Sequence, residues 1–202
     1  MRTSADCFNS FYRKISHGNI TIQRINKAHQ KGHLVQRDLE LTYNSILLSA
    51  IVSFELLMED LFYSLLANEL AFPRQIDQIQ RFSSVETAKK IVLQGGKYMD
   101  WLPIDKLEKY SDIYFIHPNN PFRVLDSRQK QEIQKVLWIR NLIAHQSEHA
   151  KKLFEDHVVG TTLIPRGPRR LLRYYQATHA GSVNKFEYHL GELVSAARAI
   201  SM

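Results

Sequence analysis

Cysteine, glycine and proline are scarce in this chain of 202 residues. It contains 1 cysteine, 8 glycines and 6 prolines. A lone cysteine, Cys7, excludes an internal disulfide and is typical of proteins in a reducing compartment. The few glycines form no phosphate-binding loop, and the pair Gly95-Gly96 is expected to end a helix. These scarcities exclude a disulfide scaffold and a P-loop enzyme.

Long apolar runs are also missing. Residues 41–54 form the least polar stretch, but serine and asparagine interrupt it. A membrane-spanning helix needs about 20 apolar residues, so we expect a core helix there. The N-terminus has no apolar segment of the signal-peptide type. We therefore expect a cytoplasmic protein with no membrane partner.

The composition otherwise fits a globular protein with a basic excess. Apolar residues make up 44% of the chain, which is enough for the core of one domain. Lysine and arginine number 27 against 20 acidic residues, for a net charge of +7. Such an excess favours a polyanionic partner, and RNA is the partner that we expect.

Apolar spacing predicts an all-α fold, a helical bundle with long antiparallel helices and a small β-hairpin near the C-terminus. We treat residues 1–202 as a single domain. It comprises an N-terminal helical segment, a core bundle, and a hairpin followed by the C-terminal helix, at residues 1–34, 35–156 and 157–202.

Turn and capping residues predict where these elements begin and end. The N-terminal segment is expected to contain one helix or two, broken near residues 17–19, and the hairpin is expected to span residues 158–175. The other predicted elements are a helix of about 50 Å from Val35 to Ala71, a short helix opened by the capping box from Ser83 to Glu86, another from Pro103, a helix from Asp126 to about Asp156, and a last helix opened by Asn184 with Glu187.

An arginine, an asparagine and a histidine fall within the helix expected from Asp126. Apolar residues at Ile133, Val136, Leu137, Ile143 and Ala144 predict its buried stripe, and Arg140 falls within that stripe. Asn141 and His145 are four residues apart and share a neighbouring face. Arg140 and His145 are five apart, which turns them about 140° from each other. Two copies of the helix, related by a two-fold axis, are needed to bring both groups to one phosphate.

Residues 140–145, Arg-Asn-Leu-Ile-Ala-His, resemble the R-(polar)-x(3–5)-H motif of the HEPN superfamily. The resemblance covers about residues 39–156, and it includes an early long helix that carries an acidic residue, Glu55. The same spacing also occurs from Arg24 to His29, but the polar residue after the arginine is missing there. The C-terminal embellishments resemble those of a toxin or phage-defence branch, namely RiboL-PSP-HEPN-like proteins.

The resemblance implies an all-α homodimer that cleaves RNA without a metal or other cofactor. His145 is then the general acid or base, Arg140 pairs with the scissile phosphate, Asn141 orients these groups, and Glu55 helps to place Arg140. The products are a 2′,3′-cyclic phosphate and a 5′-hydroxyl. An antitoxin or regulatory protein is a further expected partner. Some family members carry a modifiable tyrosine two residues after the histidine, where this chain has Ser147.

Two alternatives remain open. Residues 145–149 also fit H-x-x-E-H, in which His145 and His149 bind zinc from one helix face while Glu148 activates water. The zinc interpretation also requires a distant third ligand and a larger α/β scaffold, and the sequence does not predict such a scaffold. The other alternative is a non-catalytic HEPN-like module that binds a nucleotide, RNA or a partner protein.

A basic cluster next to two tyrosines is the remaining candidate site. Arg166, Arg169, Arg170 and Arg173 precede or flank Tyr174 and Tyr175 in the expected hairpin. Arginines can bind phosphates and tyrosines can stack on bases, so this cluster is a candidate RNA-binding surface. An exposed hairpin with ordinary solubilising charge explains it equally well.

Overall fold

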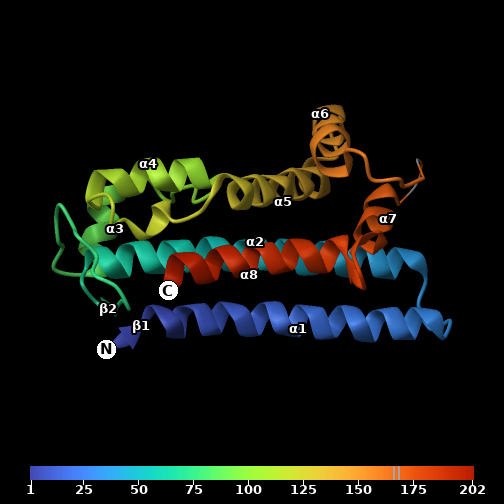
Figure 1. The fold of residues 1–202 in the computed structure, drawn as a ribbon, viewed down its shortest axis with the longest axis horizontal. Coiled ribbons are helices and arrows are strands. Elements are labelled where there is room, and N and C mark those ends of the chain that lie inside the picture. Colours follow the sequence, from blue (N-terminus) through green and yellow to red (C-terminus); the bar gives the residue numbers. More distant parts are fainter. Residues whose placement is uncertain (166, 168) are drawn as a thin grey trace. The chain divides into compact units, whose positions relative to one another are not determined.

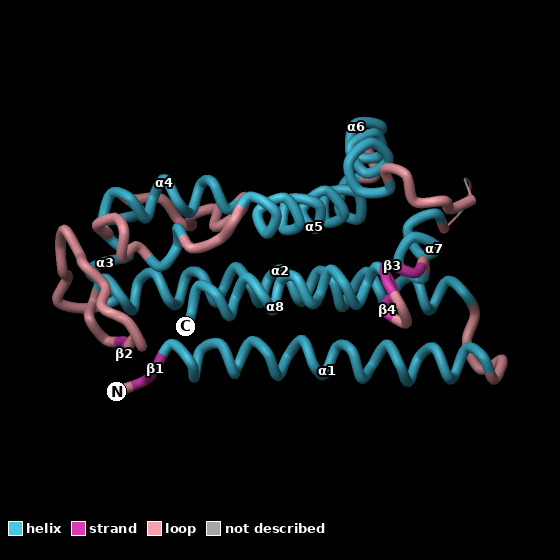
Figure 2. Tube along the Cα trace, in the orientation of Figure 1, coloured by secondary structure: helices cyan, strands magenta, loops and turns pink. Residues whose placement is uncertain are grey.

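Helices dominate the computed structural model, which describes residues 1–165, 167 and 169–202 (Figure 1). Strands in this part of the chain form two short two-stranded pairs (Figure 2). The expected mostly helical fold is therefore confirmed. Every described helix is too short or too polar to cross a membrane.

The elements follow one another along the chain in the order β1 (Arg2–Thr3), α1 (Ser4–Gln30), α2 (Gln36–Leu66), β2 (Leu70–Ala71), α3 (Val85–Leu93), α4 (Ile104–Tyr114), the 3₁₀ turn η1 (Pro121–Arg123), α5 (Ser127–His145), α6 (Glu148–Leu153), the π-helical segment η2 (Phe154–Val159), α7 (Arg170–Gln176), β3 (Thr178–Ala180), β4 (Val183–Asn184) and α8 (Lys185–Ser201). They belong to two compact units. The first comprises residues 1–12, 53–130 and 195–202, and the second comprises residues 13–52 and 131–194.

The first unit has an aromatic core around Phe62 of α2. Five rings lie with centroids 5.2–5.9 Å from that of Phe62, namely those of Tyr63, Trp101, Tyr114, Phe115 and Phe122. Edge-to-face and tilted packing at these distances adds to the stabilisation from burial. The buried carboxylate of Glu108 lies 2.5 Å from Lys130 Nζ, which supplies the countercharge that a buried anion requires.

The second unit has its core around Tyr43 of α2. The ring of Tyr43 stacks on Tyr175 of α7 at 5.6 Å and meets Phe186 of α8 edge-on at 4.7 Å. Its hydroxyl accepts a hydrogen bond from Asn26 of α1. These contacts join parts of four helices within the second unit.

Of the two possibilities predicted for the N-terminal segment, the single helix is confirmed and the break near residues 17–19 is wrong, because α1 is continuous through Gly18. A Cβ at this position would lie 2.8 Å from Ile46 Cγ2 of α2. Gly18 therefore permits close approach of the two helices instead of interrupting one of them.

Capping sequences predict most helix starts correctly. Ser84 accepts a hydrogen bond from Thr87 N at the start of α3, and Asp126 accepts one from Gln129 N before α5. Asn184 likewise accepts one from Glu187 N before α8. Each side-chain oxygen satisfies a backbone N–H that the first helical turn leaves unpaired. The long second helix is also confirmed, at Gln36–Leu66.

The predicted hairpin over residues 158–175 is wrong. The described part of this stretch contains the end of η2 and most of α7, and β3 pairs with β4 only after it. Leu171, Leu172, Tyr174 and Tyr175 are all buried on α7. Their spacing of one, three and four residues suits one face of a helix, and this pattern outweighs the strand preference of the tyrosines.

Candidate functional site

The end of α5 carries the three motif residues. Arg140 and His145 are exposed and Asn141 is half-buried, whereas Ile133, Val136 and Leu137 earlier on the helix are buried. The prediction that Arg140 belongs to the buried stripe is therefore wrong, as it is for the exposed Ala144 and the half-buried Ile143. The tightly packed part of α5 therefore ends before residues 140–145, which form the last turn and a half of the helix.

Few interactions hold these polar groups. Arg140 Nη1 donates to Asn141 Oδ1 at 3.4 Å, which is long for a hydrogen bond. Within the described part of the chain, neither Arg140 nor His145 forms an ion pair, and the imidazole of His145 makes no hydrogen bond. Both groups therefore remain available to a ligand.

The helix predicted to reach Asp156 ends at His145. Gln146 adopts a left-handed conformation with φ 46°, and Ser147 accepts a hydrogen bond from Ala150 N to cap α6. Ser147 competes with helix continuation because its hydroxyl satisfies the backbone of the next helix.

This break contradicts the H-x-x-E-H interpretation. His145 and His149 lie on different helices, so they do not share one helix face, and Glu148 pairs with Lys151 at 2.7 Å. Among the described residues, no three histidine, cysteine, aspartate or glutamate side chains cluster in a way that suits a metal ion. The zinc arrangement that depends on an unbroken helix is therefore wrong.

The basic cluster is divided by the structure. Arg166 lies outside the described residues. Arg169 is exposed, and its guanidinium donates to Gln36 of α2 at 2.7 Å. Arg170 forms a two-point ion pair with Glu155 of η2, and Arg173 is exposed. Tyr174 and Tyr175 are 1% and 0% exposed, so the prediction that they stack on bases is wrong.

Glu55 lies half-buried on α2, in the first unit, whereas Arg140 belongs to the second. Its expected pairing with Arg140 remains a prediction.

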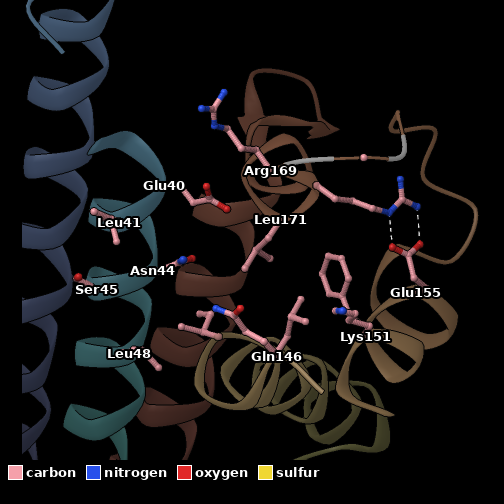
Figure 3. Close-up of a pocket in the computed structure, with 15 residues that line it drawn as sticks. Glu40, Leu41, Asn44, Ser45, Leu48, Gln146, Lys151, Glu155, Arg169 and Leu171 are labelled. Carbon is pink, nitrogen blue, oxygen red and sulfur yellow. Dashed lines mark hydrogen bonds and ion pairs between the residues drawn. The ribbon is translucent and has the colours of Figure 1, made fainter. Parts of the chain in front are cut away.

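A cavity of about 990 Å³ lies within the second unit, next to the motif helix. Figure 3 shows Glu40 and Asn44 reaching into it from α2, with Leu171 of α7 opposite and Gln146 at the end of α5. Its lining is Glu40, Leu41, Asn44, Ser45, Leu48, Leu142, Ile143, Gln146, Lys151, Phe154, Glu155, Gly167, Arg169, Arg170 and Leu171. Cavities of this size are typical of small-ligand sites.

The polar wall on α2 is held in place by Tyr175. The Tyr175 hydroxyl donates to Asn44 Oδ1 at 3.3 Å, which leaves the amide N–H groups of Asn44 directed elsewhere. Burial raises the pKa of Tyr175 well above its ordinary value, and the neighbouring Tyr174 and Glu40 add to this rise. The hydroxyl therefore stays protonated and serves as a fixed donor.

Sequence reasoning missed this cavity. Glu40 and Asn44 are one turn apart on the chain's most apolar helix, and that spacing is the signal that the sequence offers. The opposite wall comes from η2 and α7, whose cavity-lining residues were predicted as the end of one long helix and as a strand, respectively. The cavity could not be found without these two helices.

A second buried polar group lies near Tyr174. His189 of α8 is 1% exposed, and its Nε2 lies 2.8 Å from the Tyr174 hydroxyl. Burial, assisted by the positive charges of Lys135 and Lys185, lowers the pKa of His189 to about 3. The imidazole is therefore neutral at physiological pH and acts as a structural hydrogen-bonding group.

Proteins of known family, function or structure offer no direct guide to this site. Comparisons with family models, with curated proteins and with solved structures find no match to this chain.

Proposed function

We propose that this chain is a metal-independent endoribonuclease of the HEPN type that acts as a homodimer. The observation that carries the proposal is the exposure of Arg140 and His145, with Asn141 between them, on the last turns of α5. Earlier residues of the same helix are packed, so the motif emerges where packing ends. A guanidinium, an amide and an imidazole in that position can meet a sugar–phosphate backbone.

The proposed reaction transfers a proton and breaks one P–O bond. His145 removes the proton of a ribose 2′-hydroxyl, and the resulting oxygen attacks the adjacent phosphorus. The bond from phosphorus to the 5′-oxygen breaks, and that oxygen takes a proton from the second imidazole. Arg140 stabilises the negative charge on the phosphoryl oxygens, and Asn141 orients the reacting groups. The products are a 2′,3′-cyclic phosphate and a 5′-hydroxyl.

Two copies are needed because one helix directs the two groups apart. The five-residue separation turns Arg140 and His145 by about 140° around α5. A two-fold axis beside the end of α5 presents the same patch twice and supplies two imidazoles and two guanidiniums to one cleft. The active site therefore lies at the dimer interface.

The cellular role in this proposal is that of a toxin or phage-defence effector in the cytoplasm, controlled by an antitoxin or regulatory protein. Control through modification of a tyrosine two residues after the motif histidine is not part of this proposal, because Ser147 occupies that position and caps α6. The net charge of +7 supports an RNA substrate by raising the rate of encounter.

The test is incubation of purified protein with single-stranded RNA in the presence of a metal chelator. We expect fragments with 2′,3′-cyclic phosphate ends. Arg140→Ala and His145→Ala should each lower the cleavage rate by about 100-fold or more. His149→Ala is the matched control, because His149 is also exposed but lies beyond the helix break. Cleavage that persists in both motif variants, or that disappears with chelator, would contradict the proposal.

A non-cleaving HEPN-like module is the second candidate, and the cavity favours it. Leu142, Ile143 and Gln146 line the cavity from within or directly after the motif. A chain that binds a nucleotide there while leaving RNA intact would serve in recognition instead of catalysis. Binding without cleavage in the same incubation would identify this function.

A further inference from the structure

Three polar side chains in the cavity have unused hydrogen-bonding capacity. Glu40 is half-buried, and no hydrogen bond or ion pair engages its carboxylate within the described chain. Asn44 uses its oxygen for Tyr175 and keeps its N–H groups for a ligand. Gln146 is exposed, and its side chain makes no hydrogen bond within the same described residues. Glu40 and Asn44 are half-buried in the cavity lining, so a ligand that enters the cavity meets their unused groups.

We propose that the cavity binds a guanine base through its Watson–Crick edge. Glu40 accepts hydrogen bonds from guanine N1–H and from the N2 amino group. Asn44 donates its amide N–H to guanine O6. The base comes either from an unpaired guanosine in single-stranded RNA or from a free guanine nucleotide.

The order of donors and acceptors selects guanine over the other bases. A carboxylate offers two adjacent acceptors, and guanine alone presents two adjacent donors, N1–H and N2–H, on this edge. Adenine, cytosine and uracil each place an acceptor next to a donor there, which faces the carboxylate with repulsion. Guanine O6 follows N1 on the same edge, just as Asn44 follows Glu40 one turn along α2.

The rest of the lining suits a nucleotide instead of a cationic ligand. Leu48, Leu142 and Leu171 provide apolar surface for the two faces of a base. Arg169 is an exposed cation among the lining residues, and it attracts a phosphate while repelling an ammonium or guanidinium group. Lys151 pairs with Glu148 at 2.7 Å, so it contributes less. Arg170 is neutralised by Glu155, so it adds little net charge.

If the bound guanine belongs to an RNA substrate, the cavity gives the ribonuclease a base preference, because the base would lie beside the scissile bond at the end of α5. This role of the cavity rests on the proposed function. As a binding site, it stands independently of cleavage. The experiment therefore measures binding with an RNA that cannot be cut.

The probes are fluorescent oligouridines with 2′-O-methyl riboses, each containing one guanosine, inosine, adenosine or cytidine, and guanosine 5′-monophosphate as a competitor. Inosine lacks only the N2 amino group, so we expect about tenfold weaker binding than guanosine. Glu40→Gln should bring guanosine and inosine to within about twofold, because a glutamine offers one acceptor instead of two. Asp105→Asn removes an exposed charge from α4 and is the control.

A second variant keeps the test informative if Glu40→Gln unfolds. Asn44→Asp retains the oxygen that accepts from Tyr175 and places a negative charge beside O6, so it should abolish the guanosine preference. Circular dichroism checks the fold of each variant. Equal affinity for all the oligonucleotides in the folded wild type would overturn the inference.

The outcomes separate this inference from the proposed function. Guanosine-selective binding by a wild type that leaves cleavable RNA intact supports the cavity and rejects the ribonuclease. Cleavage of RNA by a wild type that binds all four uncleavable oligonucleotides equally rejects the guanine site and supports the ribonuclease. If guanosine 5′-monophosphate binds as tightly as the guanosine-containing oligonucleotide, the free nucleotide is the ligand. If the monophosphate binds more weakly than the oligonucleotide, RNA is the ligand.

Discussion

Replacing Gly18 with alanine tests the close approach of α1 to α2 within the second unit. The added Cβ would lie 2.8 Å from Ile46 Cγ2, well inside the 3.5–4.0 Å that two carbon atoms prefer. Alanine gains about 1 kcal/mol of helix propensity over glycine. Overpacking costs about 1–3 kcal/mol, so the net effect is a loss of up to about 2 kcal/mol in the free energy of unfolding.

Gly191 provides the matched control. It lies within α8, and a Cβ there would meet no atom within 4 Å. Gly191→Ala should therefore stabilise the protein by about 1 kcal/mol, since only helix propensity changes. Urea unfolding followed by circular dichroism measures both variants, and their free energies of unfolding should differ by about 1–3 kcal/mol.

The contact itself is tested by removing its second partner. Ile46→Ala deletes the methyl group that a Cβ at Gly18 would meet, so Gly18→Ala should cost less in that background. The coupling in the double-mutant cycle should reach about 1 kcal/mol. If Gly18→Ala proves as stabilising as Gly191→Ala, the two helices do not approach as closely as the structure shows and the reasoning fails.

Two further predictions concern a buried imidazole and a helix cap. The pKa of His189 is about 3 in the folded protein against an ordinary 6.5, so protonation favours the unfolded chain. Between about pH 6.5 and 5 this imidazole alone should lower the free energy of unfolding by at most about 1.4 kcal/mol per pH unit, and His189→Gln should reduce the slope there in urea titrations. Equal slopes in the two proteins over this range would refute the prediction. Ser147→Ala removes the cap of α6 and should lower stability by about 1 kcal/mol, while Ser147→Asp should retain it. Thermal unfolding compares the two, and identical melting temperatures would contradict the capping role.

The sequence predicted local features of the fold well, because they depend on neighbouring residues. The helix starts at Asp126 and Asn184 follow from a side-chain oxygen three residues before a free N–H, and the start of α3 was predicted to within one residue, with Ser84 as the cap instead of Ser83. The extent of α2 follows from its apolar spacing. No partner element is needed to make either inference.

Features that depend on other segments were predicted poorly. Gly18 looked like a helix break, because only Ile46 of another helix explains a glycine there. The tyrosines of α7 looked like strand residues, because Tyr43 and Phe186, which bury Tyr175, are distant in sequence. The motif residues were identified from their spacing, but their exposure required knowing where the packing of α5 ends. The cavity could not be predicted, because its walls come from α2, from the end of α5 and from the segment that leads to α7.

The π-helical segment shows how winding changes the meaning of a spacing. Phe154 and Val159 are five residues apart and both buried, and Gly160 N donates to Glu155 O across the same interval. A wider turn stacks residues at this separation, whereas the tighter coil of α5 sends Arg140 and His145 to different sides. Loss of a single residue between positions 154 and 159 would place Val159 four residues after Phe154, so ordinary α-helical winding would keep both side chains on the same face.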